Sequence, residues 1–412
     1  MRTIASICFT AIASLNGPRC AQCFSISRSS PNHSTTISAL YGTRVTGDIE
    51  KSNDDNVASS TNRRLLFFAG GVTAANVALQ PLTAAAAAAE VSKSFYIPPP
   101  NSMDGKTVVI TGGNTGLGLE SGKRLAAAGA EVVLTTRTLS KGEQAVADVR
   151  KYLADQGMDA KSVRVHALTL DLADFESVKK FPAALKTLLG KRPVDVLMNN
   201  AGVMAIQDLE ITKDGNERTF QTNHLGHFAL TAGLAPMLSP DARIINVSSE
   251  AWQFAAKGIE FDNLNAEREF GPWSSYGLSK LSNILFTQEL QIRADQAGKH
   301  WTVTSLHPGA VATDLARYII GEQQWNDMKT KGMTTQQKLL LIPLSKFTKT
   351  VEEGASTQIF LAADAEPTGA AFAGKYFVDL RPKSIKSSVL DPATAQKLWS
   401  VSEDMTGIKF QL

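Results

Sequence analysis

Short apolar runs alternate with amphipathic stretches along the chain from residue 98 onward. The apolar runs are rich in β-branched residues and end at glycines or polar residues, which is typical of buried strands. These predicted strands lie at residues 107–111, 131–136, 163–170, 194–198, 243–247, 301–306 and 375–379. The stretches between them repeat apolar positions at helical spacing, at residues 116–128, 141–156, 175–189, 220–238, 276–295 and 351–363. Strands separated by helices throughout predict an α/β fold, a doubly wound parallel sheet in a single domain over residues 96–412.

One stretch breaks this alternation. Residues 314–348 carry Tyr318, Trp325 and an apolar run at 339–344. We interpret this apolar insertion, which follows a strand on the side of the expected site, as a lid over an apolar binding site. The alternative is an additional helix pair that packs on the sheet or on a partner.

The first 95 residues have the composition of a targeting leader rather than of a packed domain. Residues 1–47 contain no Asp or Glu, while Ser, Thr and Arg are frequent. An apolar stretch at 3–15, followed by a Ser/Arg-rich stretch that begins at Phe24, resembles plastid targeting. We therefore expect residues 1–95 to be a mostly disordered leader.

A further targeting signal follows within the same leader. Arg63-Arg64, the apolar residues 65–79 and the alanines at 84–89 resemble a twin-arginine signal for the thylakoid lumen. The expected location is a plastid, in the stroma or in the thylakoid lumen. A disordered extension or a single membrane anchor is the alternative.

Charge and cysteine usage exclude several classes of function. The net charge is only +3 and no long basic run occurs, so nucleic-acid binding is not expected. All three cysteines lie within the first 23 residues, which leaves the folded part without a disulfide, a thiolate metal site or a thiol nucleophile. His224 and His227 have no third ligand near them in sequence. We expect them to be buried structural residues, and no metal is predicted.

A glycine-rich turn joins the first predicted strand to the first predicted helix. Gly112 allows a sharp turn, Gly116 lets the backbone approach a pyrophosphate, and Gly118 packs the helix against the strand. The helix N-terminus then offers N–H groups and a positive dipole end to phosphates. The alternative is a plain glycine-rich turn. The predicted contacts are Gly112, Asn114, Thr115, Gly116, Leu117 and Gly118.

The ends of the next two strands indicate which dinucleotide is bound. No carboxylate stands at residues 135–138, where one would bind the ribose 2′-hydroxyl of NAD. Arg137 in that turn is suited to a 2′-phosphate, so NADP(H) is the predicted cofactor; an exposed surface arginine is the alternative. Asp171 is predicted to bind the adenine amine or, alternatively, to cap the helix that follows.

Tyr276 and Lys280 lie one helical turn apart, about 160 residues after the glycine turn. Hydride transfer to a carbonyl leaves an alkoxide that must be protonated, and a phenol can supply the proton. The ammonium of Lys280 is expected to lower the pKa of Tyr276 and to bind the nicotinamide ribose. An amphipathic helix face with a solvent-reaching lysine is the alternative.

These motifs together resemble the short-chain dehydrogenase/reductase family, and within it the retinol dehydrogenase-like branch. The resemblance covers roughly residues 103–382 and rests on the turn at 111–118, Asn199-Asn-Ala-Gly202, Asn223, Val247-Ser-Ser249, Tyr276-Gly-Leu-Ser-Lys280 and His307-Pro-Gly309. It implies a Rossmann-type sheet and a catalytic tetrad formed by Tyr276, Lys280, Ser249 and Asn223. Ser249 rather than Ser248 would orient the carbonyl. Asn199 and Asn200 would hold the strand and the cofactor, and Thr313 would touch the nicotinamide.

The chain departs from the family at one place. Ser249 precedes Tyr276 by 27 residues, which is longer than the spacing typical of the family. Residues 254–274 form an insertion that also occurs in the retinol dehydrogenase-like branch, so we expect catalysis to be intact.

The sequence therefore predicts an NADP(H)-dependent oxidoreductase of an apolar carbonyl or alcohol, such as a retinoid-, carotenoid- or aldehyde-like molecule. Contact with a membrane surface through the lid or the leader is a further expectation, and the oligomeric state does not follow from the sequence. One alternative is a non-catalytic NADP-binding redox sensor in a plastid membrane complex. Another is an enzyme like protochlorophyllide reductase, but that group uses a cysteine, which this domain lacks.

Overall fold

The computed structural model describes residues 95–311 and 348–412 apart from Thr368 and Ala370, together with Gln323, Asp327, Thr330 and Gly332. The predicted leader up to residue 94, Thr313 and nearly all of the predicted lid at 314–348 lie outside the described residues.

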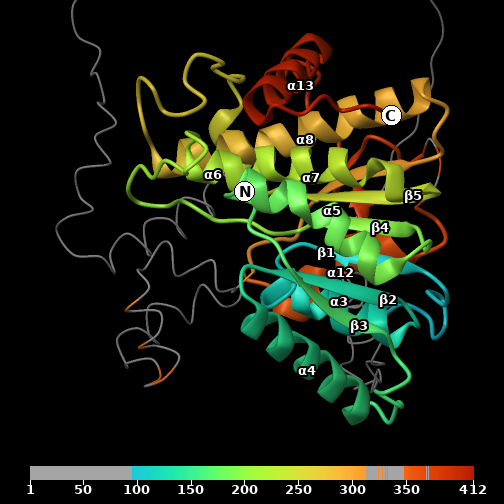
Figure 1. The fold of residues 1–412 in the computed structure, drawn as a ribbon. Coiled ribbons are helices and arrows are strands. Elements are labelled where there is room, and N and C mark those ends of the chain that lie inside the picture. The colour runs from blue at the N-terminus through green and yellow to red at the C-terminus, as the bar shows by residue number, and fades with distance from the viewer. Residues whose placement is uncertain are drawn as a thin grey trace, which may run out of the picture.

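One twisted sheet forms the centre of the described domain (Figure 1). Its strand order is β3-β2-β1-β4-β5-β6-β7-β8, with parallel neighbours except for the antiparallel pair β7/β8. The strands are β1 (Thr107–Ile110), β2 (Glu131–Thr136), β3 (Val165–Thr169), β4 (Val194–Asn199), β5 (Leu238–Val247), β6 (Thr302–His307), β7 (Tyr376–Val378) and β8 (Arg381–Pro382). The order reverses between β1 and β4, and ligands bind at such a switch point, beyond the carboxyl ends of the strands.

Helices cover both faces of the sheet (Figure 1). One layer contains α3 (Gly116–Ala127), α4 (Leu139–Asp155) and α12 (Val351–Ala363). The opposite layer contains α5 (Phe175–Leu189), α7 (Gly226–Leu234) and α8 (Pro272–Gln296), and α13 (Pro392–Thr406) packs on the outside of α8. The predicted doubly wound sheet is thereby confirmed.

The core explains why the strands read as continuous apolar runs. Every residue of β1 and β2 is buried, because helices pack on both faces of these strands. Val108 and Ile110 point into the layer of α3, α4 and α12, while Val109 packs with α5 and α7. Side chains of one strand thus alternate between two apolar cores.

The predicted helix at residues 220–238 is divided into four short segments. They are α6 (Arg218–Phe220), the π-helical turn η2 (Gln221–Leu225), α7, and the 3₁₀ turn η3 (Ala235–Met237). Pro236 is the second residue of the 3₁₀ turn, where its ring cannot continue the α-helix that precedes it. Residues 223–231 are all buried, so this stretch has no exposed face whose shift would mark an inserted residue, and periodicity does not reveal the π-helical turn.

Two further helical elements were not predicted. The 3₁₀ turn η4 (Glu250–Ala255) follows β5 directly, and α13 lies near the C-terminus. The local signals for α13 were present in the sequence. Asp391 caps its first turn by accepting from the Thr394 N–H at 3.0 Å, and Gly407 ends it at a φ of 66°. No helix within the described residues is both long and apolar enough to cross a bilayer.

Candidate functional site

The glycine turn lies between β1 and α3, at the carboxyl edge of the sheet (Figure 1). Gly112 and Gly116 have φ angles of 64° and 53°, which favour glycine. A Cβ atom at Gly118 would overlap the Gly112 carbonyl oxygen and approach the Asn200 amide to 2.6 Å. The first turn of α3 has no acidic residue, and its N-cap Thr115 makes no capping hydrogen bond with its side chain. This arrangement fits a pyrophosphate, which would lie against the positive end of α3.

The remaining residues of the turn differ in orientation. Asn114, Thr115 and Leu117 are half-buried where the turn enters α3. The Leu117 side chain faces α12, since a Cβ atom at Gly354 would lie 3.0 Å from it. Leu117 therefore contributes its backbone to the turn while its side chain anchors α3 on α12.

Thr111 and Asn200 fix the turn from beneath. The Thr111 hydroxyl accepts hydrogen bonds from the backbone N–H groups of Asn200 and Ala201, both at 2.9 Å. The Asn200 amide donates to the Thr111 carbonyl at 2.8 Å. Asn199 lies deeper, 1% exposed, and donates to Asn246 at 2.8 Å and to Thr231 at 3.1 Å. Asn200 therefore supports the glycine turn directly, whereas Asn199 ties β4 to β5 and α7.

Arg137 and Asp171 follow the carboxyl ends of β2 and β3, the two strands next to β1. Arg137 is exposed immediately after β2. Asp171 accepts from the Ala173 N–H at 3.0 Å in a local turn. The cap of α5 is Asp174, which accepts from the N–H groups of Glu176 and Ser177. The alternative prediction that Asp171 caps this helix is therefore wrong.

Tyr276, Ser249 and Lys280 meet at the carboxyl end of β5. Tyr276 is 6% exposed, and the Ser249 hydroxyl lies close enough to act on the pKa of its phenol. The Lys280 ammonium is buried 5.6 Å from the centre of the Tyr276 ring and donates to the Val247 carbonyl at 3.0 Å. The 26 residues between Ser249 and Tyr276 thus do not separate the two hydroxyl groups.

The two serines of the pair have different environments. Ser248 is 2% exposed and donates to the Lys280 carbonyl at 2.7 Å, which ties β5 to α8. Ser249 is half-buried and caps η4, since its hydroxyl accepts from the Ala251 N–H at 3.2 Å. Ser249 acts on the pKa of the Tyr276 phenol, whereas the Ser248 hydroxyl is engaged with the backbone of α8, which favours Ser249 over Ser248 as the substrate-facing serine.

Asn223 lies in the π-helical turn η2 and is fully buried. Its side chain accepts from the Val203 N–H at 2.8 Å, and donates to the Val203 carbonyl at 3.0 Å and to the Ser279 hydroxyl at 2.9 Å. A Cβ atom at Gly202 would lie 3.1 Å from the Asn223 amide oxygen and 3.6 Å from the Lys280 ammonium. The structure therefore brings Asn223 close to Lys280, with the backbone of Gly202 beside both side chains.

Burial determines the proton affinities of the site. It raises the pKa of Tyr276 to about 12, against the opposing effect of the Ser249 hydrogen bond. It also lowers the pKa of Lys280 to about 8. The expected lowering of the phenol pKa by Lys280 is not what the structure gives, because loss of hydration outweighs it. At neutral pH the phenol is protonated and Lys280 is mostly an ammonium.

The sequence pattern of the family described as short chain dehydrogenase matches residues 106–324, just over half of the 412-residue chain. This protein belongs to the short-chain dehydrogenase family. It is therefore an oxidoreductase that acts on CH–OH or C=O groups with a nicotinamide cofactor.

The similarity to individual short-chain dehydrogenases extends beyond that segment. Human retinol dehydrogenase 14 is 37% identical over 320 residues, which cover 75% of this chain and 88% of that protein. Human retinol dehydrogenase 12 is 36% identical over 313 residues, which cover 75% of this chain and 89% of that protein. The crystal structure of an uncharacterized protein from Mycobacterium paratuberculosis is 31% identical, with a TM-score of 0.57 over 77% of this chain and all of that chain.

Sequence reasoning assigned His227 only a structural place, and the structure connects it to both halves of this short-chain dehydrogenase site. His227 is 2% exposed and lies 2.8 Å from the Thr111 hydroxyl and 3.0 Å from the Asn223 carbonyl. The Thr111 hydroxyl already accepts two N–H groups, so it donates to Nε2, and Nδ1–H donates to the carbonyl. Burial lowers the pKa of His227 to about 4, which keeps the ring neutral in this chain.

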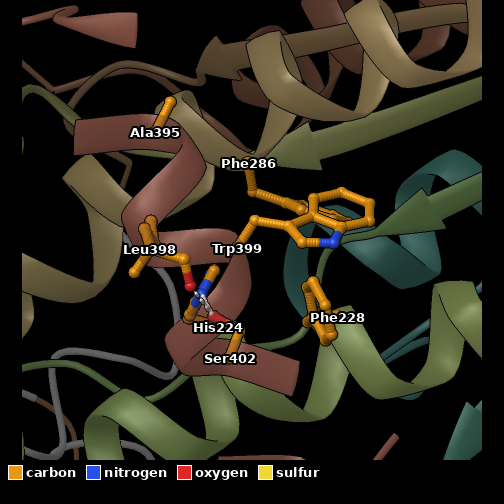
Figure 2. A pocket seen from close by; sticks show the side chains of 7 residues that line it. All are labelled: His224, Phe228, Phe286, Ala395, Leu398, Trp399 and Ser402. Carbon is orange, nitrogen blue, oxygen red and sulfur yellow. Dashed lines mark hydrogen bonds between the residues drawn. The ribbon is translucent and has the colours of Figure 1, made fainter. Parts of the chain in front are cut away.

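His224 is confirmed as a buried structural residue. It is 1% exposed and lies 2.9 Å from the Ser402 hydroxyl of α13 (Figure 2). Phe228, Phe286 and Trp399 surround this contact and hold α13 on α7 and α8. Burial lowers the pKa of His224 to about 3, so it is not a base at neutral pH.

Two further supporting residues lacked a local sequence signal. Gln358 of α12 is fully buried and donates to the Ser121 hydroxyl at 2.7 Å and to the Asn200 amide oxygen at 3.2 Å. Glu250, next to Ser249, accepts from the Tyr376 hydroxyl at 3.1 Å. Both contacts join segments more than a hundred residues apart, so only the fold reveals them.

Proposed function

We propose that this protein uses NADP(H) to reduce an apolar aldehyde or ketone, or to oxidise the corresponding alcohol. Tyr276, Lys280, Ser249 and Asn223 are the proposed working groups. The single observation that carries the proposal is the protonated, buried phenol of Tyr276 beside the Ser249 hydroxyl, with the Lys280 ammonium against its ring.

The choice of NADP(H) rests on the residues at the ends of β1 and β2. Gly112, Gly116 and Gly118 lie in a turn that only glycine residues can form at these positions. The turn lies at the N-terminus of α3. Arg137 is exposed after β2, where it can pair with a 2′-phosphate. When bound, the nicotinamide supplies the hydride for reduction or takes it up in oxidation.

Tyr276 is the proposed acid. As the carbonyl carbon gains a hydride, its oxygen becomes an alkoxide and takes the phenol proton. Because burial keeps the phenol protonated at neutral pH, the form that reduction needs is the one that predominates. The Ser249 hydroxyl is placed to donate a hydrogen bond to the same carbonyl oxygen as negative charge develops there.

Lys280 and Asn223 hold the surroundings of the acid. The Lys280 ammonium lies against the ring of Tyr276 and favours the phenolate that remains once the proton has left. Asn223 fixes the loop at Val203 and the hydroxyl of Ser279 on α8, one turn of helix after Tyr276. We propose that this support, together with Lys280, provides the route by which the phenolate is reprotonated.

The apolar substrate class is supported by the relatives named retinol dehydrogenases, which are identical to this chain at more than a third of the aligned residues. Retinoid-, carotenoid- and long-chain aldehyde-like molecules are the candidates. The predicted plastid location and the predicted contact with a membrane surface rest on the composition of the first 95 residues and of residues 314–348, and they stay part of this proposal.

The replacement Tyr276→Phe tests the proposal. It removes the transferable proton and keeps the ring, so turnover of NADPH with an apolar aldehyde should fall by about 10² to 10⁴. The dissociation constant for NADPH, measured calorimetrically, should stay within about twofold of the wild-type value. Tyr152→Phe on α4 is the matched control, and it should leave both quantities unchanged.

Two outcomes would contradict the proposal. Wild-type turnover in Tyr276→Phe would mean that another group supplies the proton. Tight NADPH binding by the wild-type protein without turnover of any aldehyde would instead favour the non-catalytic redox sensor.

A further inference from the structure

The insertion between Ser249 and Tyr276 carries two aromatic side chains to the site. Phe254 lies near its start and Trp273 near its end, and their ring centres are 5.8 Å apart at an interplanar angle of 44°. The Trp273 ring meets Tyr276 edge to face, with ring centres 6.1 Å apart and an angle of 77°. The three rings thus form a continuous row.

This row runs from the surface to the reacting group. Phe254 is 51% exposed, Trp273 is half-buried and Tyr276 is 6% exposed. The edge-to-face contact is of a kind that stabilises aromatic pairs. The exposed part of this row offers apolar surface beside the proposed acid, as the lining of a ligand-binding groove does.

The insertion is built to hold these rings in place. The Asn263 side chain accepts from the N–H groups of Arg268 and Glu269 at 2.8 and 3.2 Å, which closes the loop. Leu264 is 4% exposed and packs in an apolar cluster with α8 and α13. The Asn265 side chain accepts from the Glu217 N–H at 3.0 Å, which anchors the insertion beside the turn that bears Asn223.

The start of α8 shows how closely the two ends of the insertion are packed. A Cβ atom at Gly277 would lie 2.7 Å from the Ala251 carbonyl oxygen and 2.8 Å from the Cβ atom of Phe254. Only glycine lets η4 lie directly on the turn of α8 that follows Tyr276. Phe254 is therefore held within a few ångströms of the backbone next to the proposed acid.

We propose that Phe254 and Trp273 form the wall that binds the apolar body of the substrate, next to the carbonyl group held by Tyr276 and Ser249. This inference rests on the proposed function and specifies it. The substrate is an aldehyde or ketone whose apolar chain extends several carbons from the carbonyl group and lies along the two rings towards the surface. A short carbonyl compound reaches Tyr276 without contacting the wall.

Binding of aldehydes of different length tests the wall separately from catalysis. Propanal and decanal are titrated calorimetrically into the full-length protein loaded with NADP⁺, where no hydride is available. For Trp273→Ala the dissociation constant for decanal should rise about tenfold or more, because one or two lost apolar contacts in a pocket already discriminate to that extent. The constant for propanal should stay within about twofold. Phe254→Ser, at a half-exposed position, should give a smaller rise for decanal alone and keeps the test valid if Trp273→Ala does not fold.

Ile292→Ala is the matched control, because Ile292 is 44% exposed on the same helix about 24 Å from Tyr276. It should change neither constant. Equal losses for propanal and decanal would overturn the proposal, since they would show that Trp273 only supports Tyr276. Unchanged decanal binding in both wall variants would overturn it as well. Turnover of NADPH with decanal is measured in parallel for the wild-type protein. If the wild-type protein binds decanal without turning it over, and the wall variants lose that binding, the wall is supported and the proposed reaction is contradicted.

Discussion

Glu250 is the residue whose replacement tests the geometry of the site most sharply. It follows Ser249 directly, and its carboxylate accepts hydrogen bonds from the Tyr376 hydroxyl at 3.1 Å and from the Lys383 ammonium at 2.7 Å. On the other side, Ser248 donates to the backbone of α8 at 2.7 Å. Ser249 is therefore held between two anchored neighbours, and we expect Glu250 to position its hydroxyl.

The charge of Glu250 supplies this anchor. Burial alone would raise its pKa, but the hydrogen bond and the charge of Lys383 outweigh burial and hold the pKa below its usual value. The carboxylate is therefore ionised at neutral pH. Glu250→Gln keeps an oxygen for the Tyr376 hydroxyl, which belongs to a residue only 3% exposed, and removes the attraction for Lys383.

The size of the effect follows from the exposure of the pair. The side chains of Lys383 and Glu250 are 43% and 29% exposed, and such partly exposed pairs contribute about 1 kcal/mol at most. If that energy is lost from the positioning of Ser249, kcat falls about fivefold. Removing the Ser249 hydroxyl altogether should cost about 10² to 10³ in kcat, as for other oxyanion-type donors, and this sets the upper limit.

A double-mutant cycle separates positioning from general damage. The values of kcat and KM are measured for Glu250→Gln in the wild-type protein and in the Ser249→Ala background, with Glu260→Gln in the exposed insertion as the control. The fivefold loss should appear in the wild-type protein and shrink below about twofold in the Ser249→Ala background. An equal loss in both backgrounds would refute the reasoning, because Glu250 would then act on a group other than Ser249.

Two predictions concern the cofactor and the stability. Arg137→Asp should shift the preference from NADPH towards NADH, because a carboxylate repels the 2′-phosphate and accepts from the 2′-hydroxyl. The preference is measured as the ratio of the two kcat/KM values, and the exposed control Arg150→Asp should leave this ratio unchanged. An unchanged ratio in Arg137→Asp would mean that the 2′-phosphate binds elsewhere. The free energy of unfolding should decrease as the pH falls from about 6.5 towards 3, since the unfolded chain binds protons that buried His224, with its pKa of about 3, does not. In urea titrations at several pH values, the free energy of unfolding of His224→Gln should decrease less steeply with falling pH than that of the wild type. The exposed control His300→Gln should behave like the wild type. If His224→Gln and the wild type lose stability equally steeply with falling pH, His224 is not the cause.

The elements of the domain and the positions of its motifs followed from the sequence because their signals are local. The glycine turn precedes a helix that begins at Gly116, and Tyr276 and Lys280 lie one turn apart in a single helix. The boundaries of β1 and β2 were recovered to within one residue, because both are apolar runs buried on both faces, whereas β5 begins five residues before its prediction and the exposed β8 was not predicted. The register of that sheet then brings the ends of β1, β4 and β5 together without further information.

The supporting contacts could not be predicted in this way. Gln358 reaches Asn200 across 158 residues, and Glu250 reaches Tyr376 across 126. No periodicity or spacing links such pairs, because they depend on which side chains the packed sheet brings together. The π-helical turn around Asn223 was missed because the helix is buried on every side there, so the extra residue shifts no exposed face.

Burial also changes the chemistry expected from the Tyr276/Lys280 pair. From their spacing alone the ammonium should favour the phenolate, yet the structure buries both groups, raising the pKa of the phenol to about 12 and lowering that of the amine to about 8. A phenol that keeps its proton at neutral pH is ready to act as an acid, whereas oxidation of an alcohol needs it as a base. Burial therefore holds the phenol in the protonated form that reduction needs, and it does so through the loss of hydration rather than through any charged neighbour.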